Sequence, residues 1–177
     1  MNIDLIHDIE RLATKLRVVF ELPTEKEKFD GFQQITFETL SENIHDAFPY
    51  IFVNDNAEDS YMVKRRENKE DVFYIYISQG AAEEQKLDLL LHELAHAFFH
   101  RNSIPYDMPI GKNRGSWEQE LEANYFARAF LLPEDFFIKA LSIYSRNDGT
   151  VDLEKFSEFF KVQKRLIVER GRDLKIW

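Results

Sequence analysis

The chain has 177 residues, a length typical of one domain or of one domain with a small appendage. It contains no cysteine, which excludes disulfides, thiolate metal ligands and a cysteine nucleophile. Its 32 acidic residues and 23 Lys and Arg residues give a net charge of -9, which argues against nucleic-acid binding by the domain as a whole. The 16 phenylalanines predict a largely aromatic core, and the 6 glycines and 5 prolines are few enough to predict a mostly helical chain.

The N-terminal part of the sequence predicts two helices and then a strand. Apolar residues recur at helical spacing over 3–18 and over 25–47, and Pro23 and Pro49 mark the breaks that follow these two segments. The short apolar run 50–53 is expected to be a strand. The acidic N-terminus lacks the positive charge of a signal peptide, and no apolar run has the length of a membrane span, so we expect a cytoplasmic protein.

A β-hairpin is expected next. Tyr61–Arg66 and Val72–Ser78 have the composition of strands, and the second alternates aromatic with aliphatic residues, as a strand with one buried face does. The charged run from Lys64 to Asp71 is interpreted as a solvated hairpin tip.

The rest of the chain is predicted to be helical apart from one long loop. The hydrophobic period and the positions of proline and glycine define these segments. We expect helices at 82–100, 117–131, 134–145, 152–160 and 163–173, and a loop at 101–116.

The string His92-Glu93-Leu94-Ala95-His96 carries the clearest chemical signal in the chain. An α-helix turns about 100° per residue, so His92 and His96 lie on one face, one turn apart, and can bind the same metal ion. Glu93 lies beside that face, where its carboxylate can reach a water molecule on the metal without binding the ion. Zinc lowers the pKa of such a water from about 15.7 to near 7, so Glu93 can take its proton. The alternative is that two histidines share a helix face by chance.

A catalytic zinc ion normally has three protein ligands and one open position. His100 continues the histidine spacing, but ligands at i, i+4 and i+8 would spread over about 12 Å of helix axis, which one ion cannot span. We therefore interpret His100 as a helix-end residue. On the next predicted helix, Glu120 shares its face with small residues that let two helices approach closely, so we favour Glu120 as the third ligand over Glu118 and Glu122.

Three further residues are candidates for the surroundings of the metal. Asn124 lies one helical turn after Glu120 and is placed to hydrogen-bond a ligand histidine and fix its tautomer. Tyr106 and Tyr125 are candidates for stabilising an oxyanion, and the sequence assigns this role to neither.

Two motifs together resemble those of the ImmA/IrrE family of zinc metallopeptidases. HELAH, followed after a loop by ELEANYFARAFLLP, is similar to the HExxHxxxH and ExEANxFAxxLLxP patterns of that family, and the resemblance covers residues 72–135. The family belongs to the gluzincins, which pair HExxH with a Glu on a following helix. The resemblance implies that His92, His96 and Glu120 bind Zn²⁺ and that Glu93 is the general base.

The resemblance also implies the fold. We expect an α+β, mostly helical zincin-like domain with a small antiparallel sheet beside the HExxH helix. Residues 1–150 are expected to form this metallopeptidase domain, and residues 151–177 a helical, helix-turn-helix-like tail packed on it. Basic residues cluster in the tail, but acidic residues dilute them, so packing is favoured over DNA readout.

By resemblance, the protein is expected to be a zinc metalloendopeptidase. Its implied substrate is a helix-turn-helix (XRE-like) transcriptional repressor, which it cleaves to relieve repression in a mobile element, a phage or a stress response. Two other classes remain open: a non-proteolytic anti-repressor built on a zincin scaffold, and a DNA-binding regulator acting through the tail. The presence of Glu93 argues against the first, because a scaffold needs no general base, and the net charge argues against the second. No direct nucleic-acid partner and no membrane partner are expected.

Overall fold

A computed structural model describes residues 2–24, 29–30, 32–111 and 116–177. These residues form seven helices and a small sheet, which confirms the mostly helical α+β class. The chain divides into two compact units, the first comprising 36–126 and the second 2–35 together with 127–177. The boundary expected at residue 150 stays a prediction.

The sheet of the first unit is mixed, so the expectation of a wholly antiparallel sheet is wrong in one pairing. Its strand order is β1-β3-β2-β4. β1 (Ile51–Ala57) runs parallel to β3 (Glu70–Ser78), whereas β2 (Tyr61–Glu67) pairs antiparallel with β3 and with the short β4 (Ile110–Gly111).

The tight turn between β2 and β3 explains this topology. Asn68 and Lys69 have φ values of 50° and 73°, and two successive residues with positive φ close a two-residue hairpin whose twist matches that of its strands. The hairpin places β2 along one edge of β3. The other edge of β3 stays open to β1, which pairs with it in the parallel direction.

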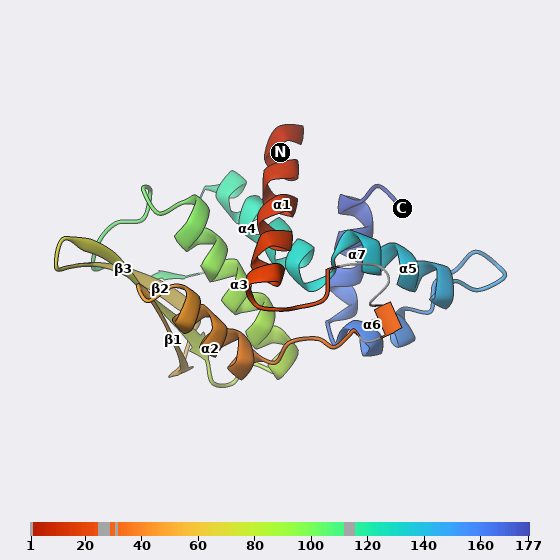
Figure 1. Cartoon of the computed structure of the whole chain (residues 1–177), viewed down its shortest axis with the longest axis horizontal. Helices are drawn as coiled ribbons and strands as arrows, with labels where there is room; N and C mark the ends of the chain where they lie inside the picture. The colour runs from red at the N-terminus through yellow and green to blue at the C-terminus, as the bar shows by residue number, and fades with distance from the viewer. Residues whose placement is uncertain (1, 25–28, 31, 112–115) are drawn as a thin grey trace. The chain divides into compact units, whose positions relative to one another are not determined.

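Two helices pack on the sheet of the first unit (Figure 1). α3 (Glu83–Phe99) packs against β3, and α2 (Phe37–Ala47) packs against β1 and α3. The prediction of one helix over 25–47 is wrong for its described N-terminal part, because α2 begins only at Phe37. The Thr36 side chain accepts a hydrogen bond from the Thr39 backbone N–H and so caps the helix there. Residues 25–28 and 31 lie outside the described residues.

The second unit is helical and has the aromatic core that the sequence predicts. Its elements are α1 (Ile3–Val19), the end of α4 (Trp117–Leu131), α5 (Glu134–Tyr144), α6 (Leu153–Phe160) and α7 (Lys164–Asp173). The Phe29 and Phe159 rings stack with their centroids 4.7 Å apart, and those of Phe32 and Phe136 lie 5.1 Å apart. Such aromatic pairs contribute about 0.5–1.5 kcal/mol each beyond the area they bury.

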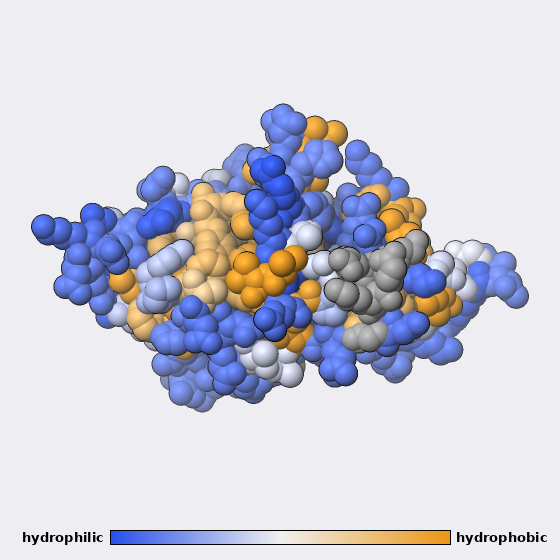
Figure 2. All heavy atoms as spheres, viewed as in Figure 1, coloured by the Kyte–Doolittle hydropathy of each residue, from blue (hydrophilic) through white to orange (hydrophobic). Residues whose placement is uncertain are grey.

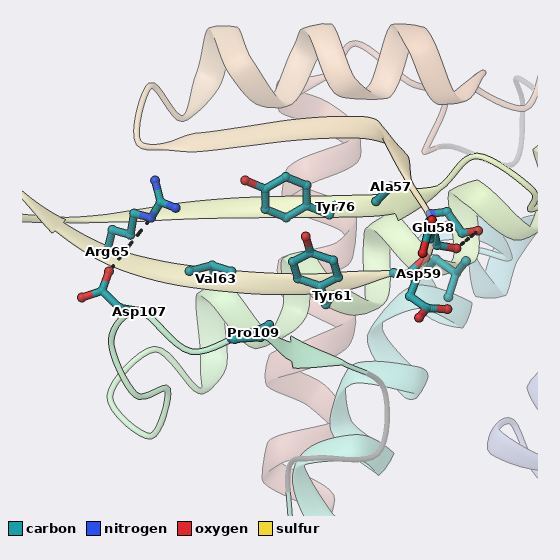
Figure 3. Close-up of a pocket in the computed structure, with 12 residues that line it drawn as sticks. Ala57, Glu58, Asp59, Tyr61, Val63, Arg65, Tyr76, Asp107 and Pro109 are labelled. Carbon is teal, nitrogen blue, oxygen red and sulfur yellow. Dashed lines mark hydrogen bonds and ion pairs between the residues drawn. The ribbon is translucent and has the colours of Figure 1, made fainter.

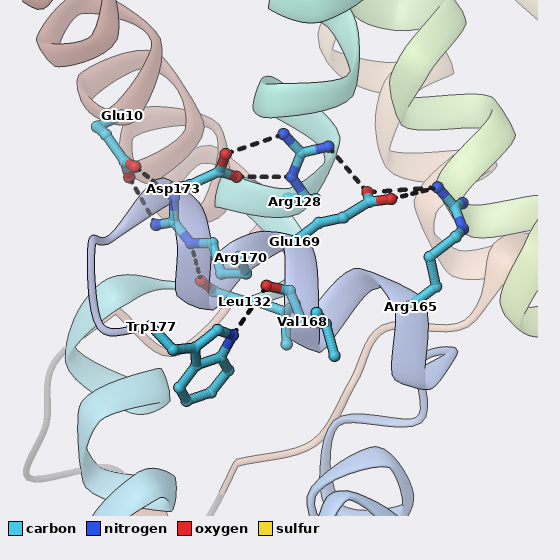
Figure 4. Close-up of polar contacts among 9 residues, drawn as sticks. All are labelled: Glu10, Arg128, Leu132, Arg165, Val168, Glu169, Arg170, Asp173 and Trp177. Atoms are coloured by element: carbon cyan, nitrogen blue, oxygen red, sulfur yellow. Dashed lines mark hydrogen bonds and ion pairs between the residues drawn. The ribbon is translucent and has the colours of Figure 1, made fainter.

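Ion pairs hold α7 within the second unit (Figure 4). Arg170 is fully buried; it donates to both carboxylate oxygens of Glu10, at 2.6 and 3.0 Å, and to the Leu132 carbonyl. Arg128 donates to Asp173 and Glu169. The two helices expected in the tail are therefore present, and both belong to a packed unit.

One face of the protein is mainly polar. Hydrophilic residues dominate the face seen in Figure 2, as the high content of charged residues predicts. None of the helices among the described residues combines the length and the hydropathy that crossing a bilayer requires.

Candidate metal centre

Helix α3 buries the HExxH residues inside the first unit. Its leucines Leu90, Leu91 and Leu94 are fully buried and fix the helix in the core. On the same helix His92 and Glu93 are each only 1% exposed. The chemically active side chains are thus held by a rigid, packed helix and not by a loop.

Three predicted ligands converge on one point. The Nε2 atoms of His92 and His96 lie 3.1 Å apart. Glu120, from α4, places one carboxylate oxygen 3.3 Å from His92 Nε2 and the other 3.6 Å from His96 Nε2. One ligand atom from each residue lies within 4.8 Å of the other two, so these three residues form a candidate metal site.

The donor set and its spacing fit zinc. Imidazole nitrogens and carboxylate oxygens are ordinary zinc ligands, and two atoms each about 2.0–2.1 Å from a tetrahedral zinc ion are about 3.3 Å apart. The observed separations of 3.1, 3.3 and 3.6 Å surround that value. Burial, together with the charge of nearby His92, lowers the pKa of His96 to about 4, so its ring is neutral near pH 7, as metal binding requires.

Asn124 occupies the position that the sequence predicts for it. Its Oδ1 lies 3.1 Å from His92 Nδ1 and accepts a hydrogen bond from the N–H group there. The His92 tautomer with its proton on Nδ1 has an unprotonated Nε2, which is the atom that faces Glu120.

Sequence reasoning missed two residues of the site. The candidate metal group among the described residues does not include His100, but His100 is more than a helix-end residue, because its Nδ1 lies 2.9 Å from His96 Nδ1. Glu122, which was considered only as an alternative ligand, places Oε2 2.9 Å from His100 Nε2. The spacing of four residues between His96 and His100 was the signal in the sequence for a contact between their side chains. The contact between His100 and Glu122 could not be read from the sequence, because it forms only when α4 lies against α3.

The two tyrosine candidates differ in their surroundings. The Tyr106 hydroxyl donates to Asp71 at 2.8 Å, so its proton is already engaged at the β2–β3 hairpin. Tyr125 is buried in α4. The role of stabilising an oxyanion is therefore assigned to neither tyrosine.

The charged run of the hairpin is not merely a solvated tip. Lys64 is only 4% exposed; its Nζ donates to the Arg101 carbonyl at 2.8 Å and lies 3.3 Å from Asp71. The Tyr106 ring packs on the same ammonium group, 4.3 Å from its centroid. The hairpin is thereby tied to the loop that follows α3.

A small pocket of about 200 Å³ opens beside the candidate metal site. Two histidines at the end of α3, His96 and His100, form one part of its wall, and Gln119 of α4 forms another. The remaining lining residues follow α3 and are mainly apolar: Ser103, Ile104, Pro105, Met108, Pro109 and Ile110. A pocket of this kind suits an uncharged side chain of a ligand bound at the metal.

A larger open groove of about 1030 Å³ lies along β2 and β3 (Figure 3). The stacked rings of Tyr61 and Tyr76, with centroids 4.6 Å apart, line it, together with the ion pair between Arg65 and Asp107. Among the residues that the structure describes, its lining includes none of the three candidate metal ligands.

Comparisons with known proteins agree with this site. The solved structure of a Mycobacterium tuberculosis transcriptional regulator is similar, with a TM-score of 0.56 and 21% sequence identity over 93% of this chain and 46% of that one. This likeness shows a shared fold, and the chain spans less than half the length of that regulator. No curated protein matches the chain significantly. The sequence profile described as the IrrE N-terminal-like domain, which defines a peptidase family, matches residues 57–171. This match covers more than half of the chain and contains every residue of the candidate metal centre, so the chain belongs to the IrrE N-terminal-like domain family of peptidases.

Proposed function

We propose that the protein is a zinc-dependent metalloendopeptidase. The observation that carries this proposal is the convergence of His92, His96 and Glu120 on one point, with Glu93 buried on the same helix. Bound zinc would polarise the scissile carbonyl and lower the pKa of water from about 15.7 to near 7. The membership of a peptidase family supports the same reaction.

The protein side chains have separate tasks in this reaction. His92, His96 and Glu120 hold the metal. Glu93 accepts a proton from the attacking water on a carboxylate oxygen and delivers it to the leaving nitrogen as the C–N bond breaks. The products are a carboxylate and an amine, and Glu93 is returned to its starting state. Burial of Glu93 keeps bulk water from competing for this proton.

We further propose that the substrate is a helix-turn-helix transcriptional repressor, which cleavage inactivates. The resemblance of both motifs to the ImmA/IrrE pattern supports this substrate class. The similar fold of a protein named as a transcriptional regulator is consistent with it. The direct test is to incubate the zinc-loaded chain with helix-turn-helix repressors from its own genome, beginning with any that is encoded beside its gene, and to map the cleavage site by mass spectrometry. A repressor that stays intact would reject this substrate.

Glu93→Gln tests whether the protein acts by cleavage or by docking. Glutamine keeps the size and hydrogen-bonding capacity of the side chain but cannot take the proton, so the variant should bind zinc and repressor normally. Cleavage should fall by about 10²–10⁴-fold or more. Glu118→Gln, at an exposed position of α4, is the matched control and should cleave like the wild type. If Glu93→Gln relieves repression in cells as well as the wild type does, docking alone is the function.

A further inference from the structure

A row of three hydrogen-bonding side chains extends from the candidate metal site to α4. His96 and His100, on successive turns of α3, approach each other through their Nδ1 atoms at 2.9 Å. The far nitrogen of His100, Nε2, lies 2.9 Å from Glu122 Oε2. Both histidines are buried, and the Glu122 side chain is only 20% exposed, so water has little access to these contacts.

The position of each proton follows from the partner at the end of the row. Glu122 Oε2 lies 2.9 Å from His100 Nε2, and a carboxylate oxygen accepts hydrogen bonds from N–H groups, so this contact places a proton on His100 Nε2. The His100 tautomer with its proton on Nε2 has a bare Nδ1, which accepts a hydrogen bond from the Nδ1–H group of His96. Neutral His96 is left with a bare Nε2, the atom that faces His92 and Glu120.

We propose that His100 and Glu122 are positioning residues that fix the tautomer and ring orientation of His96. The inference rests on the metal site of the proposed function but not on peptidase activity. In many metal sites a carboxylate accepts a hydrogen bond from the histidine that binds the metal. Here a second imidazole, that of His100, lies between the carboxylate of Glu122 and His96. Loss of such outer partners costs about 10–100-fold in metal affinity.

The two ligand histidines are thus supported by different chemistry. His92 faces a neutral amide, Asn124, whereas the row behind His96 ends in a carboxylate. A carboxylate at the end of the row makes the imidazoles before it stronger electron donors. His100 has both ring nitrogens engaged, by His96 and by Glu122, and is not available as a fourth ligand.

The first experiment measures the tautomers directly in the zinc-free full-length chain. Long-range ¹H–¹⁵N NMR spectra at neutral pH should show His96 protonated at Nδ1 and His100 protonated at Nε2. Glu122→Ala removes the acceptor at the end of the row, so both rings should become mixtures of tautomers. Glu118→Ala removes an exposed carboxylate from the same helix and should leave both spectra unchanged. A wild-type His96 protonated at Nε2 would overturn the proposal. This measurement uses only the wild-type protein, so it does not depend on whether a variant folds.

The second experiment measures zinc affinity by competition with a chelator. His100→Ala and Glu122→Ala should each weaken zinc binding by about 10–100-fold. Glu122→Gln retains an acceptor oxygen and should recover most of this loss. Because the row acts as one unit, the double variant His100→Ala/Glu122→Ala should bind zinc no more weakly than His100→Ala. The proposal would be refuted if both single variants bound zinc as tightly as the wild type. It would also be refuted if the losses of zinc affinity in the two single variants added up in the double variant. If the wild type cleaves no repressor, the proposed function fails. The positioning role of His100 and Glu122 is unaffected by that result, because zinc affinity and tautomers are measured without a substrate.

Discussion

The metal site depends on the few atoms that face one another across α3 and α4. His92 and His96 come from one helix and Glu120 from the other, so none of the three is placed by a loop. The carboxylate of Glu120 lies within 3.6 Å of both histidines, whereas Glu122, only two residues later, faces His100. Two positions on α4 therefore separate a candidate metal ligand, Glu120, from a residue that contacts His100 instead.

Substitution of the ligands should remove the metal. His92→Ala, His96→Ala and Glu120→Ala should each lower the zinc content from about one ion per chain to a small fraction, because a catalytic zinc ion needs all three protein ligands. Metal analysis of the dialysed proteins measures this directly. Glu118→Ala is the control and should remain loaded. Zinc retained by Glu120→Ala and lost from Glu118→Ala would reverse the assignment.

Asn124 gives a second prediction for a single residue. Asn124→Ala removes the oxygen that accepts from His92 Nδ1, so zinc affinity should fall by about 10–100-fold. Asn124→Asp keeps an acceptor at this position and should bind zinc more tightly than Asn124→Ala. Equal affinities of the alanine variant and the wild type in a chelator competition would show that Asn124 does not position His92.

At the scale of elements, the β2–β3 hairpin is tied to the loop after α3 by one carboxylate. Asp71 accepts from Tyr106 at 2.8 Å and from Arg66 at 2.7 Å, and it lies 3.3 Å from the buried Lys64 ammonium. The Tyr106 hydroxyl, and then the two cations, hold the pKa of Asp71 well below its ordinary value of 3.8. Removal of this carboxylate would leave a buried cation without its ion pair.

The variant Asp71→Asn should therefore destabilise the protein in a pH-dependent way. At pH 7 we expect a loss of about 1–3 kcal/mol in the free energy of unfolding. A pKa lowered in the folded state adds stability that is present above the unfolded pKa and is lost as the pH falls. The difference between wild type and variant, measured by urea unfolding from about pH 7 down to about pH 3, should thus shrink below about pH 4.

Glu70→Gln, at an exposed position of the same hairpin, is the control for this series. Its free energy of unfolding should stay within about 0.5 kcal/mol of the wild type throughout. If the difference between wild type and Asp71→Asn is independent of pH, the ion pairs of Asp71 do not stabilise the fold.

At the scale of the whole chain, three basic residues of the tail are paired with carboxylates. Arg170 pairs with Glu10 in the interior, Arg165 contacts Glu169 at 3.1 Å, and Lys164 contacts Glu154. Partners of this kind lower the positive potential that a DNA phosphate would meet. The net charge of -9 adds long-range repulsion.

We therefore predict no sequence-specific DNA binding by this chain. Electrophoretic mobility shifts with the DNA upstream of its own gene, at moderate salt, should show no specific complex. The double variant Lys164→Ala/Arg165→Ala should behave like the wild type. A specific complex of nanomolar affinity that this variant abolishes would show that the tail reads DNA.

The sequence by itself determined the elements whose signals are local. The helix of the HExxH motif and Trp117–Leu131 follow from hydrophobic period, because a helix forms its hydrogen bonds within a few residues. The choice of Glu120 over its neighbours was likewise possible, because helical geometry puts it on the face with the small residues. His92, His96, Glu120 and Asn124 come together as predicted.

Only the tertiary structure decided the features that join distant segments. The polar strand residues of β1, such as Asn54, show no strand pattern, yet Asn54 pairs with Tyr76 because β3 offers a free edge after the hairpin has formed. The contact between His100 and Glu122 joins residues 22 positions apart, and Lys64 is buried by a loop that lies 37 positions later. Periodicity and motif spacing describe one element at a time. The pairing of strand edges and of side chains across helices depends on which surfaces meet, and that is decided when the whole unit packs.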